Sequence, residues 1–171
     1  GRNAGLIGTI ENRIAGRAIK SQFTTPEAPE LQELLSSMVQ EGVTTVIMET
    51  SSHALKLKRV ADCEFDGAVF TNLTQDHLDF HSSFREYLEA KCRLFKQVCE
   101  NGWGIINIDD AHAEDVIDAV EGNIFTYGIN NKADINAENI DLNPMGVKFN
   151  ISGEDNLTYE LNLTGKFNVY N

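Results

Sequence analysis

Short apolar runs alternate with helix-like segments along most of the chain. Runs rich in β-branched and aromatic residues predict strands at residues 5–10, 43–48, 66–71, 104–108 and 124–127. Between them, apolar residues at three- and four-residue spacing predict helices after Pro26, after Glu49, from Ser83, and through Val120, where Asp109 or Asp110 is the expected cap. This alternation predicts an α/β fold with a mostly parallel sheet and flanking helices.

The pattern changes at residue 133. Residues 135–142, 146–151 and 157–163 predict three strands joined by Asn-Pro-Met-Gly and Gly-Glu-Asp-Asn turns, which is typical of a small antiparallel three-stranded sheet. Residues 166–171 begin another helix. We therefore divide the chain into an α/β part (1–132), a meander (133–165) and the start of a truncated helix (166–171), and we expect it to be part of a longer protein.

The helix from Ser83 carries a lysine on its apolar side. Ser83 and Glu86 form the pattern of a capping box. The apolar positions of the segment are Phe84, Leu88, Phe95 and Val98, with Tyr87, Leu94 and Cys99 at the margins. Lys91 falls among them, so its amine either reaches out to solvent or meets a carboxylate or a metal site. Burial lowers the pKa of a lysine, and a neutral amine can take up carbon dioxide to form an anionic carbamate.

Polar clusters follow several of the predicted strands. Asp76, His77, Asp79 and His81 crowd the loop after residues 66–71. Glu49 ends another strand and is followed by a Ser-rich helix start, an arrangement that suits a cation beside an anion. Thr24 and Thr25 precede a third helix. The alternative in each case is local: a solvated turn, a serine N-cap, or threonines that only cap a helix.

Composition restricts the partners. The 171 residues are 42% hydrophobic and 23% charged, as in ordinary globular domains, and the net charge is −12. No basic stripe is present, so we expect no nucleic-acid partner, and an anionic ligand needs helix N-termini, Mg²⁺ and a few placed cations. Three cysteines without C-x-x-C spacing argue against disulfides and zinc, and no apolar run of membrane-spanning length or signal-like N-terminus occurs. We expect a cytoplasmic location and no membrane partner.

Four motifs in order resemble the central domain of the Mur ligases over nearly the whole chain. They are residues 49–53 (ETSSH), residues 71–81 (TNLTQDHLDFH), Ala90-Lys91, and residues 165–171 (GKFNVYN). The chain is most similar to the tripeptide synthetase type. That type adds the third peptide residue to UDP-N-acetylmuramoyl-L-Ala-D-Glu during peptidoglycan (cell-wall) synthesis, which supports cell shape and cell division.

The resemblance implies roles for particular residues. Glu49 and His77 match metal-holding positions, and Lys91 matches the lysine that is carbamylated to support a second Mg²⁺; Lys91 and His77 are the implied catalytic residues. The implied contacts to the UDP-muramoyl-dipeptide are Thr24, Thr25, Ser51 and Arg59, and the implied contacts to the ATP adenosine are Asn168 and Asn171. The family activates the dipeptide carboxylate as an acyl phosphate with ATP, and an incoming amino acid displaces the phosphate.

The chain also departs from the family pattern. Leu57 stands where relatives can carry a polar substrate contact, and no G-x-x-x-x-G-K-[ST] phosphate loop occurs in the sequence. We therefore expect the fragment alone to be inactive, with an incomplete sheet through which it can self-associate. Two alternatives remain: a non-catalytic module that binds a nucleotide sugar and Mg²⁺, and a metal hydrolase with a carbamylated lysine. The sequence does not identify the added amino acid.

Overall fold

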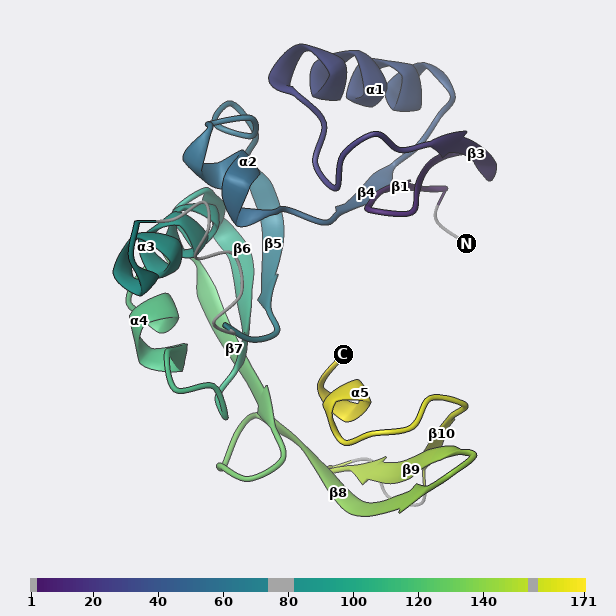
Figure 1. Ribbon diagram of the computed structural model, residues 1–171, viewed down its shortest axis with the longest axis vertical. Helices are drawn as coiled ribbons and strands as arrows, with labels where there is room; N and C mark the ends of the chain where they lie inside the picture. Colours follow the sequence, from purple (N-terminus) through teal and green to yellow (C-terminus); the bar gives the residue numbers. More distant parts are fainter. Residues whose placement is uncertain (1–2, 74–81, 154–156) are drawn as a thin grey trace. The chain divides into compact units, whose positions relative to one another are not determined.

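The computed structural model describes residues 3–73, 82–153 and 157–171. The chain divides into two compact units, shown together in Figure 1. Unit 1 holds residues 1–63 and 79–91, and unit 2 holds residues 64–78 and 92–171. The predicted cluster Asp76, His77, Asp79 and His81 lies outside the described residues.

Unit 1 is built on a four-stranded sheet with the order β3-β2-β1-β4. Its strands are β1 (Ala4–Ile7), β2 (Glu11–Ile14), β3 (Arg17–Lys20) and β4 (Thr45–Met48). Strands β2 and β3 form an antiparallel hairpin, and Ala15 and Gly16 turn between them with φ of 46° and 85°. Strand β1 pairs with β4 in parallel, so the residues after Ile7 and Met48 leave the same edge of the sheet.

Two helices belong wholly to unit 1. Helix α1 (Ala28–Gln40) buries Leu31 and Met38, whereas the apolar residue Val39 is 73% exposed. Glu27, not a threonine, is its N-cap residue, and it makes no side-chain cap. Helix α2 (Ser52–Lys56) confirms the helix predicted after Glu49 and is short, because the chain turns at Leu57 and at Lys58, which has φ of 59°.

Helix α3 (Phe84–Phe95) runs from unit 1, which ends at Lys91, into unit 2. The predicted cap is confirmed in part. Glu86 N donates to Ser83 Oγ (3.2 Å), but the Glu86 carboxylate accepts from Ser82 N (2.8 Å) and not from Ser83 N. The prediction that Val98 and Cys99 lie on this helix is wrong, because the helix ends at Phe95 and both residues begin a strand.

Unit 2 contains one six-stranded mixed sheet with the order β10-β9-β8-β7-β6-β5. Its strands are β5 (Phe65–Phe70), β6 (Val98–Asn107), β7 (Asn123–Gly128), β8 (Ile135–Asn143), β9 (Gly146–Ile151) and β10 (Thr158–Leu161). Strands β5, β6 and β7 are parallel, and β8 to β10 form the predicted antiparallel meander. Strand β8 joins the two parts, because its start pairs with β7 in parallel.

Short helices complete unit 2. Helix α4 (Ala113–Ile117) packs against β6, and the core includes Phe70, Phe95, Ile106 and Val116. The predicted helix through Val120 is therefore too long. The N-cap residue of α4 is His112, and not Asp109 or Asp110 as predicted. Helix α5 (Phe167–Tyr170) confirms the predicted helix start near the end of the chain. In the described part of the chain, no helix is long and apolar enough to span a bilayer.

Candidate functional site

Thr25 joins the loop before α1 to the loop after β4. Its hydroxyl donates to the Glu49 carbonyl oxygen (2.9 Å) and accepts from Ser51 N (3.0 Å). The residue is 1% exposed, so both bonds are shielded from water. Ser51 in turn accepts from Ala54 N at the start of α2 (3.2 Å). Ser51 therefore does cap a helix, whereas Thr25 does not cap one and instead fixes the course of the Glu49–Ser51 loop.

The Glu49 carboxylate is held from the end of β1. Thr9 N and Thr9 Oγ1 both donate to Glu49 Oε2, at 2.9 and 2.5 Å, and the Thr9 and Thr24 hydroxyls lie 3.1 Å apart. Glu49 Oε1 accepts no hydrogen bond from the residues that the structure describes. Carboxylate and hydroxyl oxygens are the ligands that Mg²⁺ prefers, and Mg²⁺ needs few protein ligands because it keeps several waters. The donor set at Glu49 therefore fits Mg²⁺.

Arg59 lies beside the same loop. Its Nη1 donates to the Thr25 carbonyl oxygen (3.0 Å), its Nη2 pairs with Glu27, and its guanidinium lies 5.2 Å from the centre of the Phe23 ring. The side chain is 13% exposed. Its Nε is buried and is the one such side-chain atom without a hydrogen-bond partner in the described part of the chain. A buried N–H without a partner is unfavourable, so this donor is suited to a bound acceptor.

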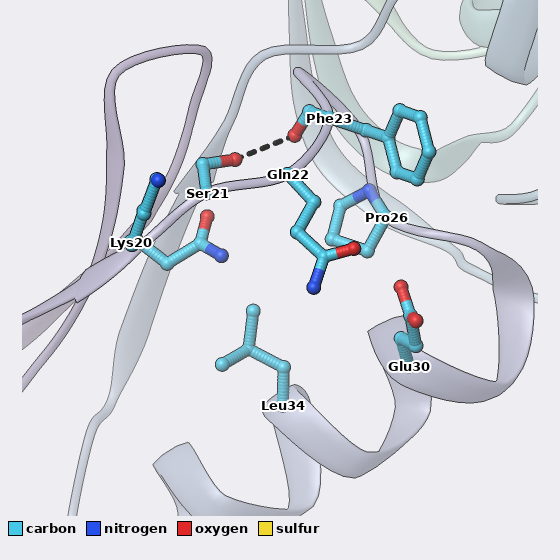
Figure 2. Close-up of a pocket in the computed structure, with 8 residues that line it drawn as sticks. Lys20, Ser21, Gln22, Phe23, Pro26, Glu30 and Leu34 are labelled. Atoms are coloured by element: carbon cyan, nitrogen blue, oxygen red, sulfur yellow. Dashed lines mark hydrogen bonds between the residues drawn. The ribbon is translucent and has the colours of Figure 1, made fainter.

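An open pocket of about 160 Å³ lies between α1 and the loop of residues 21–26. Figure 2 shows Lys20 at the end of β3, Gln22 on the loop that follows, and Glu30 and Leu34 on α1. The Ser21 hydroxyl donates to the Phe23 carbonyl oxygen (2.6 Å) and fixes the start of the loop. The lining mixes charged and apolar side chains and includes Phe23 and Pro26, which flank Thr24 and Thr25 in the sequence.

Lys91 is partly buried on α3, next to the buried residues Tyr87 and Ala90. Its ammonium lies 6.0 Å from the centre of the Tyr87 ring, and no carboxylate in the described part of the chain pairs with it. Burial lowers the pKa of this amine, as expected for a lysine that lacks an anionic partner. The start of α3 is anchored nearby in sequence, where Glu86 pairs with Lys56 of α2 (2.7 Å).

The remaining predicted site residues are not in this network. Asn168 and Asn171 belong to unit 2, where Asn168 Nδ2 donates to the Thr164 carbonyl oxygen (2.6 Å) and Asn171 is exposed. His77 lies outside the described residues. Leu57, the departure from the family pattern, is 54% exposed at the end of α2.

Sequence reasoning missed Thr9 and Glu27, which hold Glu49 and Arg59. A signal existed for Thr9, because it follows a strand that runs parallel to the strand before Glu49, and both residues leave the same sheet edge. No comparable signal marked Glu27, since its pairing depends on the turn at residues 57–58.

Comparison with known proteins gives consistent matches. The family model described as the Mur ligase middle domain matches residues 1–171. The UDP-N-acetylmuramoyl-L-alanyl-D-glutamate–2,6-diaminopimelate ligase of Clostridium botulinum is 46% identical over 172 residues, covering 100% of this chain and 35% of the relative. The ligase of the same name from Caldanaerobacter subterraneus subsp. tengcongensis is 48% identical, covering 98% of this chain and 34% of the relative.

A solved structure of a UDP-N-acetylmuramoyl-L-alanyl-D-glutamate–2,6-diaminopimelate ligase aligns with a TM-score of 0.81 and 31% identity. The alignment covers 99% of this chain and 35% of the solved one. The chain therefore spans about a third of the length of the relatives that it matches.

Proposed function

Because this chain belongs to the Mur ligase family, we propose that it is the middle domain of an ATP-dependent ligase of peptidoglycan synthesis. The reaction joins an amino acid to UDP-N-acetylmuramoyl-L-Ala-D-Glu through an acyl phosphate. The relatives with 46% and 48% identity are named as 2,6-diaminopimelate ligases, which supports 2,6-diaminopimelate as the added residue. We place the enzyme in the cytoplasm, where the nucleotide substrate and ATP are available.

The observation that carries the proposal is the hydrogen-bonded network around Thr25. It joins Glu49, Ser51 and Arg59, which the family resemblance assigns to metal and substrate binding. Thr25, the Glu49–Ser51 loop and Arg59 come from three separate stretches of the chain, and their direct bonds hold them in one place. A site that is held in position before the substrate arrives loses less entropy on binding.

In this proposal Arg59 binds an oxygen of the muramoyl-dipeptide. The guanidinium is already fixed by Glu27 and by the Thr25 carbonyl oxygen, and its buried Nε lacks a partner. Ser51 and the two threonines line the same loops and orient the substrate. The ring of Phe23 covers one face of the guanidinium, which keeps water from it and strengthens its attraction for an anion.

Glu49, with His77 and carbamylated Lys91, would hold Mg²⁺, which supplies positive charge for the transferred phosphoryl group. Thr9 keeps the Glu49 carboxylate oriented through two hydrogen bonds. Lys91 changes from a cation to an anionic oxygen donor when it takes up carbon dioxide, and its partial burial and lowered pKa favour the neutral amine that this step requires. Asn168 and Asn171 contact the adenosine.

A coupled phosphate-release and product assay tests the proposal. It uses a ligase of the relatives' full length that contains this chain. We expect turnover that requires ATP, Mg²⁺ and the UDP-muramoyl-dipeptide, with 2,6-diaminopimelate preferred over lysine, and loss of turnover in EDTA. Binding of the nucleotide sugar without any turnover would favour the non-catalytic module instead, and metal-dependent hydrolysis without ATP would favour the hydrolase.

A further inference from the structure

Asp109 follows β6, and its carboxylate connects two segments that are distant in sequence. Oδ2 accepts from Ile129 N (2.6 Å) and Asn130 N (2.8 Å), and Oδ1 accepts from Asn131 N (2.7 Å) and from the Asn131 side-chain amide (2.9 Å). The Tyr170 hydroxyl also donates to Oδ2 (2.9 Å). One side chain thus holds both the loop after β7 and the helix α5.

Helix α5 has few other means of keeping its position. It is a four-residue helix with no buried residue, and a helix of one turn is not stable by itself. Apart from the bond of Asn168 Nδ2 to the Thr164 carbonyl oxygen, just before the helix, its side-chain bonds to the rest of unit 2 within the described residues pass through Asp109 and Asn130. Asn130 Nδ2 donates to Tyr170 Oη (3.2 Å), and Lys166 Nζ donates to Asn130 Oδ1 (3.1 Å). Asn130 is itself held by Asp109 through its backbone amide.

The charges at this contact agree with the geometry. Burial by itself raises the pKa of Asp109, but the amides of residues 129–131 and the Tyr170 hydroxyl outweigh it and lower the pKa to about 2. Burial and the bond to the Asp109 carboxylate raise the pKa of Tyr170 to about 12. At neutral pH the bond therefore joins a full anion to a neutral donor, and hydrogen bonds to charged groups are stronger than those between neutral groups.

We propose that Asp109 is a positioning residue for nucleotide binding: through Tyr170 it fixes α5, which carries Asn168 and is followed by Asn171, against the loop of residues 129–131. The inference rests on the proposed function, in which these asparagines contact the adenosine of ATP. The adenosine is remote from the phosphoryl group that reacts. Loss of the positioning bond therefore weakens the binding of ATP and of the transition state equally, which raises KM and leaves kcat nearly unchanged.

The test uses a ligase of the relatives' full length that contains this chain, with the variants Asp109→Asn, Tyr170→Phe, their double mutant, and Asp134→Asn. Asp134 is the matched control, because it is an exposed carboxylate near the same loop that bonds to Thr126 and not to α5. We expect Asp109→Asn and Tyr170→Phe each to raise the KM for ATP about tenfold, with kcat within about twofold of the wild type. Asp134→Asn leaves both values within about twofold.

The double mutant shows whether Asp109 acts through Tyr170 or whether the two residues affect ATP binding independently. If Asp109 acts through Tyr170, the double mutant is no worse than Asp109→Asn, whereas independent effects multiply to about a hundredfold. A wild-type KM in Tyr170→Phe overturns the inference, and so does a loss confined to kcat. A wild-type enzyme that does not use ATP overturns the proposed function instead, so the two failures are distinguishable.

A second measurement detects the bond without any activity. In protein labelled at the tyrosine ring carbons, the NMR signal missing from Tyr170→Phe is assigned to Tyr170. We expect it to stay un-ionised at about pH 10.5, above the ordinary tyrosine value of about 10, and to ionise at a lower pH in Asp109→Asn than in the wild type, because the bond to the carboxylate is lost while burial remains. An unchanged titration in Asp109→Asn shows that the contact is absent.

Discussion

At the scale of single residues, the sharpest prediction concerns the activity of variants at Lys91. Its amine lies over the Tyr87 ring, is partly buried, and has its pKa lowered by burial. If it functions as a carbamate, Lys91→Ala abolishes acyl-phosphate formation while the fold is retained. Lys91→Arg fails equally, because a guanidinium does not form a carbamate. Lys91→Glu keeps a trace of activity, since it restores an anionic oxygen at shorter reach.

The control for this series is Lys96→Arg, at an exposed lysine just beyond the same helix. The measurement is turnover in a ligase of full length, with circular dichroism to check the fold. If Lys91 is instead an ordinary lysine that reaches out to solvent, the order of activities is reversed. Lys91→Arg then has nearly wild-type activity, and Lys91→Glu loses activity. An active Lys91→Arg enzyme therefore removes the carbamate from the mechanism.

The lowered pKa of Asp109 leads to a prediction about stability at acidic pH. Its pKa is lowered from 3.8 to about 2 in the folded state, so the folded protein binds this proton less readily than the unfolded chain. The stabilisation is complete above the unfolded value and is lost as the pH falls through the folded value. We expect Asp109→Asn to flatten the dependence of Tm on pH between about 4 and 2, which thermal unfolding by circular dichroism measures. Asp118→Asn, at an exposed carboxylate that makes no side-chain hydrogen bond in the described residues, should leave the slope unchanged.

Individual side-chain roles were predictable only where neighbours in sequence define them. Ser51 as an N-cap and Lys91 as a partly buried amine follow from helical spacing alone. The roles of Thr25 and Asp109 depend on loops brought together by the sheets. Local capping rules gave the wrong partner for both residues, because the tertiary partners are more than 15 residues away and leave no periodic signal.

At the scale of elements, α3 offers a test of helix capping. Ser83 Oγ accepts from Glu86 N, so Ser83→Ala removes a bond from the first turn. We expect the free energy of unfolding to fall by about 1 kcal/mol, as measured by urea denaturation. Ser36→Ala is the matched control, because Ser36 lies at an exposed position inside α1, where alanine is the better helix former. Equal destabilisation by both variants would show that capping is not the cause.

Strand–helix order was largely predictable, and the errors lie at element ends. Val98 and Cys99 continue the apolar spacing of α3, but they pair in β6, where Val98 lies opposite Phe65 of β5. Helical spacing and strand pairing compete for such residues, and sheet contacts decide the outcome. The three strands of the meander were predicted correctly. That the meander continues the parallel sheet was not predicted, because it depends on the pairing of Tyr127 with Ile135, which no local pattern indicates.

At the scale of the whole molecule, the chain covers 35% of the Clostridium botulinum relative and contains no Gly-Lys-Thr/Ser phosphate loop. Such a loop supplies backbone N–H groups and a lysine to the phosphates, and nothing in this sequence replaces it. We expect the 171-residue chain alone neither to hydrolyse ATP nor to ligate. A steady-state phosphate-release assay measures this, with the full-length ligase as positive control, and substrate-stimulated Mg²⁺-dependent turnover by the chain would contradict it.

The sharing of β8 between parallel and antiparallel neighbours has a consequence for hydrogen exchange. Only two residue pairs join β8 to β7, whereas five join it to β9 across an irregularity at Glu138 and Asp141. A segment held to its neighbour by so short a ladder opens as a unit at lower free energy than the core beside it. Amides of β9 and β10 should therefore exchange with deuterium together and before those of β6, so that the protein loses its meander first and keeps its parallel strands longest.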